Sequence, residues 1–373
     1  MPYIPPTGVG GTIITPAMDS ADPKSPAIKG RGTPENPTNR FERLVVVPDP
    51  DLPPEDRPAA RTEFLRDATR SVITTNDSPD IPFEASLNPY RGCEHGCVYC
   101  FARCMHEYLG FSAGLDFETK IMVKMDAPQL LRKELSARSW KPKRIAIGTA
   151  TDPYQPVERK LQLTRQCLQV LAEFRNPFTL ITKNQLITRD LDILAQAAKQ
   201  QLTAVYLSIT TLDAGLVRVL EPRTSVPRNR LAAIEKLAAA GVSVGVLVSP
   251  MIPGLTDHEV ASILRAAAAA GVKYAGLQPV RLPGQVEQLF TAWLQRHRPD
   301  RAEKVLNRIR EMHGGGTNSS NFHERREGKG IFAEQVRELF EMTCRQLGLS
   351  DDGPELRTDL FRRVERGQME LFQ

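Results

Sequence analysis

The segment that decides the fold is 88–104, which reads NPYRGCEHGCVYCFARC. Its first three cysteines, Cys93, Cys97 and Cys100, are separated by three and then two residues, and the glycines just before the first two permit tight backbone turns. Thiolates in such an arrangement bind iron–sulfur clusters, and full ligation of a cluster takes four of them. If only three cysteines bind, one iron remains open to a substrate or cofactor, which distinguishes a reactive cluster from an electron-transfer cluster.

Two other interpretations of this segment stay open. All four of its cysteines, or some of them with His95 and His106, could close a tetrahedral zinc site, although a short zinc ribbon needs no long run of strands and helices after it. Cys104 could instead be a fourth cluster ligand. We favour Cys104 as a bystander or backup ligand because it lies roughly one helical turn beyond Cys100. The two histidines are expected to face solvent or to surround the ligands.

After this segment the chain alternates short apolar runs with helical patterns. The runs are 86–90, 144–148, 178–182, 204–209, 242–248 and 274–277, and the helices are expected at 127–137, 160–174, 188–200, 228–240 and 257–270. Gly241 and Gly271 stand where glycine commonly ends a helix just before the next strand. Alternating apolar strands and helices indicate an α/β fold with a parallel sheet. Six strands are too few for a closed eightfold barrel, so we predict a partial (β/α)6 barrel with its site at the C-terminal ends of the strands.

The composition is that of a globular protein with a sizeable core. The chain has 373 residues, 41% hydrophobic and 25% charged, and its formal net charge of +5 permits a phosphate-rich partner without requiring one. No stretch approaches the ~20 apolar residues of a transmembrane helix, and the N-terminus lacks the layout of a secretion signal. Secreted frameworks spread their cysteines, whereas four of the six here lie within twelve residues. We therefore expect a metal-binding protein of the reducing cytoplasm, and neither a membrane protein, a coiled coil nor a disulfide scaffold.

The barrel is flanked by two regions of different composition. Thirteen of the 29 prolines precede residue 60, so the first 80 residues are expected to form an extended arm, either disordered or wrapped over the barrel. The expected domains are an arm at 1–80, a barrel at 81–282 and a helical extension at 283–373. Within the arm, 1–35 is expected to be disordered and 44–47 is the one strand candidate. Within the extension, helices are expected near 285–312, 331–347 and 355–366, with a flexible loop at 313–330.

The cysteine segment resembles the radical SAM superfamily, since Cys-x3-Cys-x2-Cys follows the first barrel strand and Tyr99 immediately precedes the last cysteine. The resemblance implies that Cys93, Cys97 and Cys100 hold a 4Fe-4S cluster whose open iron is chelated by the amino and carboxylate groups of S-adenosylmethionine (SAM). An electron from a donor such as flavodoxin or ferredoxin would break the sulfonium C–S bond. The resulting 5′-deoxyadenosyl radical would abstract hydrogen from a substrate.

The strand ends are similar to those of the spore photoproduct lyase-like branch, often described as DNA repair photolyase-like. The similar stretches are 149–156, 180–183, 206–210, 221–224 with Arg230, and 249–253. The resemblance places cofactor-binding side chains at Tyr99, Asp152, Lys183, Ser208 and Thr210. Lys183 would neutralise the SAM carboxylate, Ser208 and Thr210 would offer hydroxyls to the ribose or methionine, and Asp152 would accept from a ribose hydroxyl or a substrate donor.

Each of these assignments has a structural alternative. Lys183 could cap a helix or face water, and the hydroxyl of Ser208 could satisfy a backbone carbonyl. Glu221 and Arg223 could form an ion pair that holds the loop after the fourth strand.

One residue departs from the lyase pattern. In the lyase a cysteine just after the second strand returns a hydrogen atom to the product, and Thr149 stands at the matching position here. A threonine O–H bond is much stronger than a thiol S–H bond, so Thr149 cannot readily donate hydrogen to a carbon radical. Cys167, in the following helix, is expected to be core packing. The lyase reaction itself is therefore not expected.

Two features of the extension bear on partners. The tail Gln368–Phe372 resembles the Gln-x-x-Leu-Phe peptide by which bacterial repair and replication proteins dock on the sliding clamp, although it would equally suit an amphipathic end that folds back on its own domain. The loop 313–330 mixes glycine, hydroxyl and basic residues around Phe322, which suits phosphate contacts with one stacking residue or a disordered surface loop. We expect it to act as a lid over the substrate, since a radical must be shielded from water.

Together these features predict a radical SAM enzyme whose substrate is nucleic acid, in a repair or modification reaction. One alternative is a radical SAM enzyme that acts on a protein or a small molecule. Another is a non-enzymatic iron–sulfur or zinc protein that serves as a structural or redox module bound to DNA.

Overall fold

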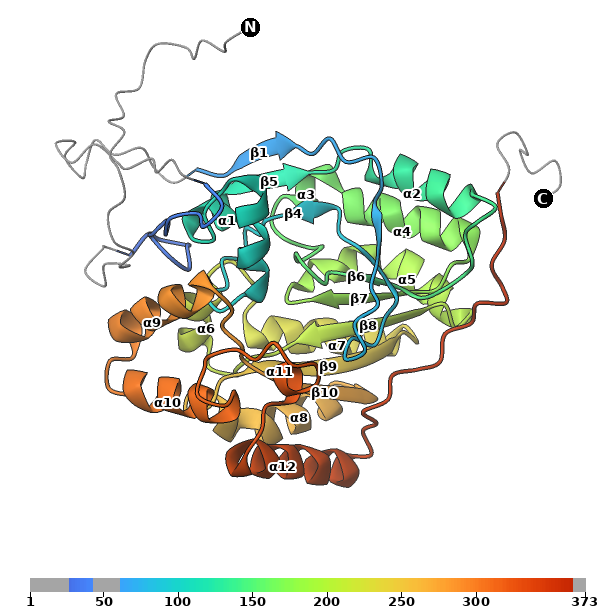
Figure 1. Ribbon diagram of the computed structural model, residues 1–373. Helices are drawn as coiled ribbons and strands as arrows, with labels where there is room; N and C mark the ends of the chain where they lie inside the picture. The colour runs from blue at the N-terminus through green and yellow to red at the C-terminus, as the bar shows by residue number, and fades with distance from the viewer. Residues whose placement is uncertain (1–26, 43–60, 365–373) are drawn as a thin grey trace, which may run out of the picture.

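The computed structural model describes residues 27–42 and 61–364, and its largest element is a seven-stranded sheet (Figure 1). In spatial order the strands are β10 (Tyr274–Pro279), β9 (Ser243–Met251), β8 (Thr203–Ser208), β7 (Phe178–Thr182), β6 (Ile145–Ile147), β3 (Ala85–Leu87) and β2 (Ile73–Thr75). The first six run parallel, whereas β2 pairs antiparallel with β3. Because β2 and β10 are the two edges, the sheet is open, and the predicted partial barrel of six parallel strands is confirmed.

Helices supply the crossover connections that parallel strands need. They are α2 (Ala127–Ser136), α3 (Glu158–Leu161), α4 (Leu163–Phe174), η4 (Gln185–Asp190), α5 (Leu191–Lys199), α6 (Ala214–Leu220), α7 (Pro227–Ala239), η5 (Asp257–Glu259) and α8 (Val260–Ala269). The apolar faces of α2, α4, α5, α7 and α8 pack with the buried strands in one core, whereas Leu216 and Leu220 of α6 belong to a second cluster. Gly241 and Gly271 follow α7 and α8 with φ of 79° and 100°, so both predicted helix ends are confirmed.

A second, three-stranded sheet carries the cysteine segment. It consists of β1 (Glu63–Arg66), β5 (Lys120–Val123) and β4 (Tyr90–Arg91), with β5 in the middle. Between β4 and β5 the chain forms η2 (Phe101–Met105), η3 (Glu107–Leu109) and α1 (Leu115–Thr119). These elements are too short for a hydrophobic repeat to develop, which is why the sequence pattern did not predict them.

The described parts of the N-terminal region pack against the barrel. The backbone amide of Leu115 donates to the carbonyl of Glu35 at 2.7 Å, and the side chain of Asn39 donates to the carbonyls of Glu107 and Phe111. The expectation of disorder is therefore wrong for 27–35, and the alternative of an arm wrapped over the barrel holds for 27–42. In addition, β1 and β2 precede residue 81, so the sheets begin earlier than the expected barrel boundary. The strand candidate at 44–47 lies outside the described residues.

The C-terminal extension differs from the prediction in two places. It contains α9 (Gln285–His297), α10 (Ala302–Met312), α11 (Glu324–Glu327) and α12 (Ile331–Leu347). The single helix expected over 285–312 is broken at Arg298–Arg301, because Pro299 disfavours helical backbone in the residue before it. The helix expected over 355–366 is wrong for the described residues 355–364, which form no regular element. No helix within 27–42 or 61–364 has the length and apolar character to cross a membrane.

The segment after α12 crosses the N-terminal edge of the main sheet. Ser350 forms a bridge with Tyr274 at the start of β10. The amide of Arg357 donates to the carbonyl of Gln201, just before β8, and that of Arg362 donates to Phe174, just before β7. Backbone hydrogen bonds along this edge replace the helical bonds that the sequence pattern suggested. Residues 368–372 lie outside the described residues, so the clamp-binding tail stays a prediction.

Candidate functional site

The three cysteines predicted to bind a cluster lie between β4 and η2, at the C-terminal edge of the main sheet. The amide of Val98 in this loop donates to the carbonyl of Leu220, beyond the end of β8. Figure 1 shows the neighbouring elements β4 and α1 on the side toward which the arrow of β7 points. Gly92 and Gly96 have φ of 78° and 68°, so the loop uses the left-handed backbone that glycine permits. The predicted location of the site is thus reproduced.

The thiols of this loop lie in an environment that suits a metal ligand. Cys93 and Cys97 are buried, Cys100 is half-buried, and none of them is in a disulfide. Burial raises the pKa of Cys100 to about 11, and the neighbouring Cys93 adds to the rise. Burial likewise raises the pKa of Cys97. The protein alone therefore disfavours thiolates here, whereas bound iron would supply the positive charge that deprotonates them. The donor set fits a three-cysteine cluster.

The mononuclear zinc alternative finds no matching geometry in the described chain. Among residues 27–42 and 61–364, no three His, Cys, Asp or Glu side chains are arranged to hold a single metal ion.

The thiol of Cys104 makes its hydrogen bond toward the start of α9. Its Sγ donates to the carbonyl oxygen of Pro283, just before α9, at 3.1 Å. Burial raises its pKa, and its charged neighbours are Glu107 and Arg40, not the other thiols. This placement supports the interpretation of Cys104 as a bystander.

A fully buried arginine within the segment holds the cysteine loop in place. Arg103 donates through Nε to the carbonyl of Cys97 at 3.0 Å and through Nη1 to the carbonyls of Ala113 and Gly114. Its Nη2 pairs with Oε1 of Glu118 at 2.6 Å, and both side chains of this ion pair are fully buried. Burial raises the pKa of Glu118, and the charge of Arg103 opposes that rise. Sequence analysis missed this pair, because nothing in the sequence links Arg103 to Glu118.

The N-terminal segment adds a second layer over the same loop. The amide of Gly32 donates to Oε2 of Glu118 at 2.9 Å, and the guanidinium of Arg31 donates to the carbonyl of Glu118. Gly32 lies so close to Gly96 that a Cβ at Gly32 would overlap the carbonyl oxygen of Gly96. Glu118 thus connects the N-terminal segment, through Arg103, to the backbone of the cysteine loop.

Three of the five predicted cofactor-binding residues meet at one buried carboxylate, Glu221. The hydroxyl of Tyr99 donates to Oε1, Thr210 donates to the same oxygen at 2.7 Å, and the ammonium of Lys183 lies 3.3 Å from it. Arg230 pairs with Oε2. Burial disfavours the charge of Glu221, but Arg230 and Lys183 outweigh it and hold the pKa of Glu221 well below its usual range. The carboxylate therefore stays ionised and joins the cysteine loop to the ends of β7 and β8.

Lys183 uses its three donors within the protein. Besides contacting Glu221, its Nζ lies 2.9 Å from the carbonyl of Ser249 and 3.3 Å from Oγ1 of Thr210, and it lies over the ring of Tyr99. The role at the SAM carboxylate stays a proposal, because a ligand would have to replace one of these contacts.

Asp152 is occupied by protein donors on both oxygens. Oδ1 accepts from the amide of Tyr154 at 2.9 Å and from Thr182 at 2.7 Å. Oδ2 accepts from the amide of Lys183 at 2.8 Å and lies 3.3 Å from Nδ1 of His95. A carboxylate has about four lone-pair positions, so little capacity remains for a ribose hydroxyl. The geometry favours a positioning role for Asp152.

The remaining predicted residues are buried around the same centre. Ser208 is buried at the end of β8, and its carbonyl accepts from Nη1 of Arg230 at 2.8 Å. Its proposed contact with the cofactor stays a proposal. The alternative ion pair between Glu221 and Arg223 is wrong, since Arg223 instead pairs with Glu94 of the cysteine loop at 3.2 Å.

His95 and His106 are both buried, so the expectation that they face solvent is wrong. Their burial agrees with the other expectation, that they surround the candidate cysteine ligands. His95 lies between Asp152 and the side-chain amide of Asn184. Burial opposes its charge, yet Asp152 and the nearby Cys93 raise its pKa to about 10. His106 packs against two phenylalanine rings, and burial lowers its pKa to about 4.

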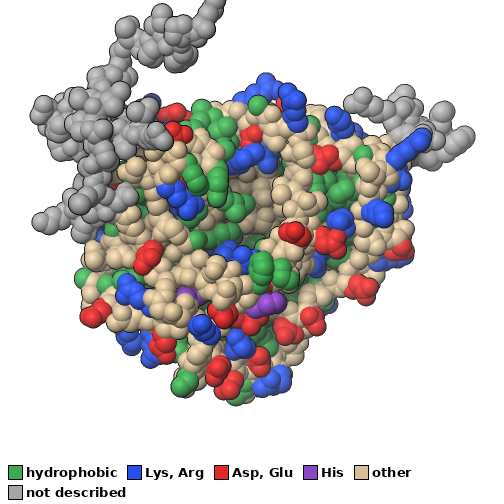
Figure 2. All heavy atoms as spheres, viewed as in Figure 1, with side chains coloured by type: hydrophobic (Ala, Val, Ile, Leu, Met, Phe, Trp, Pro, Cys, Tyr) green, Lys and Arg blue, Asp and Glu red, His purple; other side chains and the backbone are tan. Residues whose placement is uncertain are grey.

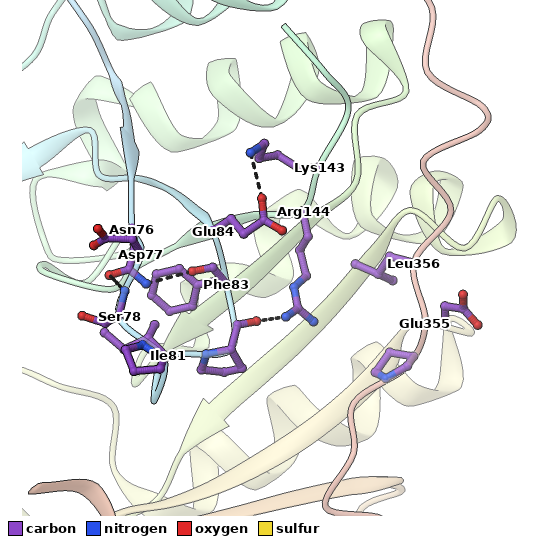
Figure 3. A pocket seen from close by; sticks show the side chains of 13 residues that line it. Asn76, Asp77, Ser78, Ile81, Phe83, Glu84, Lys143, Arg144, Glu355 and Leu356 are labelled. Atoms are coloured by element: carbon purple, nitrogen blue, oxygen red, sulfur yellow. Dashed lines mark hydrogen bonds and ion pairs between the residues drawn. The ribbon is translucent and has the colours of Figure 1, made fainter. Parts of the chain in front are cut away.

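A cavity of about 530 Å³ lies at the opposite edge of the sheet (Figure 3). The loop between β2 and β3, the residues before β6 and the stretch 354–356 line it. Its charged groups pair within the wall, since Lys143 contacts Glu84 at 2.8 Å and Arg144 donates to the carbonyl of Pro82. Because it lies at the N-terminal ends of the strands, it is separate from the cysteine site.

Comparison with known proteins agrees with this geometry. The profile of the Radical SAM superfamily matches residues 87–267, which span the cysteine loop and most of the barrel. An uncharacterized protein of Mycobacterium tuberculosis is 39% identical over 241 residues, covering 63% of this chain and 69% of that protein. The chain belongs to the radical SAM superfamily. An uncharacterized protein of Methanocaldococcus jannaschii is 28% identical over 201 residues, covering 54% of this radical SAM chain and 72% of the relative.

Among solved structures, the radical SAM chain resembles spore photoproduct lyase in fold. A variant of that lyase matches with a TM-score of 0.57 at 17% identity, covering 81% of this chain and 86% of the lyase. The lyase complexed with dinucleoside spore photoproduct matches with a TM-score of 0.56 at 16% identity and the same coverage. At this identity the likeness concerns the fold alone. As a member of the superfamily, the chain is an enzyme that uses a 4Fe-4S cluster and SAM and needs an electron donor.

Replacing Cys93, Cys97 or Cys100 by Ala should abolish the iron–sulfur signal and SAM cleavage together, because two thiolates do not retain the cluster. Replacing Cys104 should leave both largely intact, since its thiol contacts Pro283. Anaerobic reconstitution with iron and sulfide, followed by spectroscopy and measurement of 5′-deoxyadenosine, checks this. Equal losses in all four variants would favour a four-cysteine site.

Gly32→Ala should loosen the cysteine loop, because the added Cβ overlaps the carbonyl oxygen of Gly96. We expect several-fold faster loss of iron from the reconstituted variant to a chelator. Gly316→Ala is the matched control, since the nearest atom to its Cβ lies at an ordinary distance of 3.4 Å. Unchanged iron release from the Gly32 variant, with a normal circular dichroism spectrum, would show that the N-terminal segment does not protect the loop.

Proposed function

We propose that this radical SAM enzyme acts on nucleic acid, with the 5′-deoxyadenosyl radical abstracting hydrogen from a nucleotide in a repair or modification reaction. The observation that carries the proposal is the basic and aromatic border of the open side of the barrel. Figure 2 shows a hollow near the middle of the face seen in Figure 1, with hydrophobic and with Lys or Arg side chains around it. A groove that binds a single strand combines cationic and aromatic side chains, and Arg325 over the ring of Phe322 is such a pair on this side of the barrel.

The segment 313–330 contributes to this border. Arg325 lies over the ring of Phe322 at 4.9 Å, and Phe322 is half-exposed. Arg325 also makes two hydrogen bonds of 2.6 Å to Asp80 in the β2–β3 loop, and Arg326 donates to the carbonyl of Asp80. These contacts join the segment to the other side of the open barrel, which supports the lid proposed from the sequence.

The residues of the site would position the reactants and exclude water. When bound, the cluster and SAM supply the radical chemistry. Glu221 holds Tyr99, Thr210 and Lys183 beside the cysteine loop, so a ligand there meets preorganised groups. Cys93 and Cys97 lie on the buried side of the loop, which limits access of water to the site. We propose that a one-electron donor such as flavodoxin or ferredoxin reduces the cluster.

Because Thr149 stands where the lyase has its hydrogen-donating cysteine, we do not propose direct reversal of a thymine photoproduct as the reaction. The hydroxyl of Thr149 accepts from the side-chain amide of Asn88 at 3.2 Å, just after β6. Cys167 is fully buried in α4, and burial raises its pKa. Thr149 has no S–H bond, and the S–H bond of Cys167 is buried, so neither residue can return hydrogen to a substrate.

The proposal is tested with anaerobically reconstituted protein, SAM and a reductant. Deuterated single-stranded DNA, duplex DNA and RNA are supplied in separate reactions, and deuterated peptides serve as the control class. Transfer of deuterium from a nucleic acid into 5′-deoxyadenosine is the expected result, because the radical takes its hydrogen from the substrate. Transfer from peptides alone would refute the nucleic-acid proposal and favour a protein substrate.

Incubation with DNA that carries thymine photoproducts should give no repair, or reversal with poor product yield, because Thr149 cannot return hydrogen to a carbon radical readily. Chromatography of the digested DNA measures the thymine released. Thr149→Cys is the matched variant, and it should improve the yield if the hydrogen donor is the missing component. Clean, multiple-turnover repair by the unmodified protein would show that another group returns the hydrogen.

A further inference from the structure

Arg281 lies two residues beyond β10 and next to the cysteine loop. The carbon of its guanidinium lies 4.6 Å from the ring centroid of Phe101, the residue that follows Cys100. The side chain is half-buried, and its Nε is buried without a hydrogen-bond partner. No residue in the described part of the chain forms an ion pair with it. Phe101 therefore orients the guanidinium while its buried Nε has no partner among the described residues.

Such an arrangement is unusual, because a guanidinium carries five N–H donors and a buried donor without a partner is costly. The nearby charges do not compensate. Burial and the charges of Arg325 and Arg326 lower the pKa of Arg281, and Asp80 and the Cys100 thiol oppose them. The carboxylate of Asp80 is already engaged by two hydrogen bonds from Arg325. Asp80 is thus committed to Arg325, and no carboxylate among the described residues forms an ion pair with Arg281.

Lys183 provides the contrast within the same site. Its ammonium contacts Glu221, Thr210 and the carbonyl of Ser249, so its charge is balanced inside the protein. Arg281 has no equivalent of Glu221. Of these two cations beside the cysteine loop, Arg281 is the one whose buried donor, Nε, has no partner within the described part of the chain.

We propose that Arg281 binds an oxyanion of a molecule held at the mouth of the barrel. The planar fork of a guanidinium matches both phosphate and carboxylate oxygens. A phosphate of a nucleic-acid strand is one source, and this case rests on the proposed function. The carboxylate of SAM is the other source, and it is independent of the substrate class. In either case, Phe101 places the fork beside the cysteine loop.

The test uses Arg281→Met, which keeps an apolar stem over Phe101, and Arg281→Lys, which keeps the charge but loses the fork. Arg363→Met is the control, since Arg363 also lies near a phenylalanine ring but donates to the carbonyls of Arg138 and Trp140 at the opposite edge of the sheet. Iron content and thermal melting show whether each variant is folded and loaded. Affinity for a fluorescent single-stranded oligonucleotide over a range of salt concentrations, and affinity for SAM, are then measured anaerobically.

If the oxyanion is a phosphate, Arg281→Met should weaken oligonucleotide binding roughly tenfold. The slope of log affinity against log salt should also become shallower by about 0.7, the value for one contact to a single strand. If it is the SAM carboxylate, SAM affinity should fall and the salt slope should not change. Arg281→Lys should recover part of whichever loss occurs. Unchanged affinity for both ligands in a folded, loaded Arg281→Met variant would overturn the proposal.

These outcomes separate the inference from the proposed function. If the unmodified protein binds no oligonucleotide and transfers no deuterium from nucleic acid, the proposed function fails, and the SAM measurement alone decides the role of Arg281. If the unmodified protein acts on nucleic acid but Arg281→Met binds both ligands normally, the function stands and the oxyanion site is refuted.

Discussion

The buried ion pair between Arg103 and Glu118 is the interaction on which the geometry of the cysteine loop depends. Arg103 reaches the carbonyl of Cys97, and Glu118 accepts the amide of Gly32, so one pair links the loop, α1 and the N-terminal segment. Removing one partner of a fully buried pair typically costs about 3–5 kcal/mol, because the other charge is left without compensation. The pair therefore acts as a positional constraint: the loop keeps its shape only while all three segments are in place.

A second buried carboxylate, Glu221, connects the cysteine loop to the ends of the barrel strands. It binds Tyr99 from the loop, Lys183 after β7 and Arg230 in α7. Polar groups buried in this way are stabilising only when every member is paired, and here the pairing is complete around Glu221. Arg281 is the exception on the same edge, with a buried donor that has no partner among residues 27–42 and 61–364. The difference separates a cation that maintains the site from one that is available to a ligand.

The fold and the cysteine loop bear on the cofactor chemistry, whereas the open side of the barrel bears on the substrate. The barrel, the cysteine loop and membership of the superfamily establish cluster and SAM chemistry, yet one fold hosts many reactions. The proposed nucleic-acid substrate rests instead on the open side of the barrel, where Arg325 lies over the ring of Phe322. We propose that Thr149 is where this chain departs from the lyase pattern, since a shared fold is compatible with a different final step.

The sequence by itself determined the six parallel strands of the barrel and brought out the three candidate cluster ligands, because both are local patterns. Apolar runs that alternate with helical repeats specify parallel strands, and the Cys-x3-Cys-x2-Cys spacing lies within one loop. The family resemblance also brought out Tyr99 beside the last cysteine, and Lys183 and Thr210 just after parallel strands, whose ends share one edge. Only the tertiary structure decided their partners. Glu118 meets Arg103 and Gly32, Asp152 is saturated by backbone and side-chain donors, and Arg281 is left unpaired on Phe101. These relations join residues far apart in the chain, and hydrophobic periodicity carries no information about which buried charge faces which.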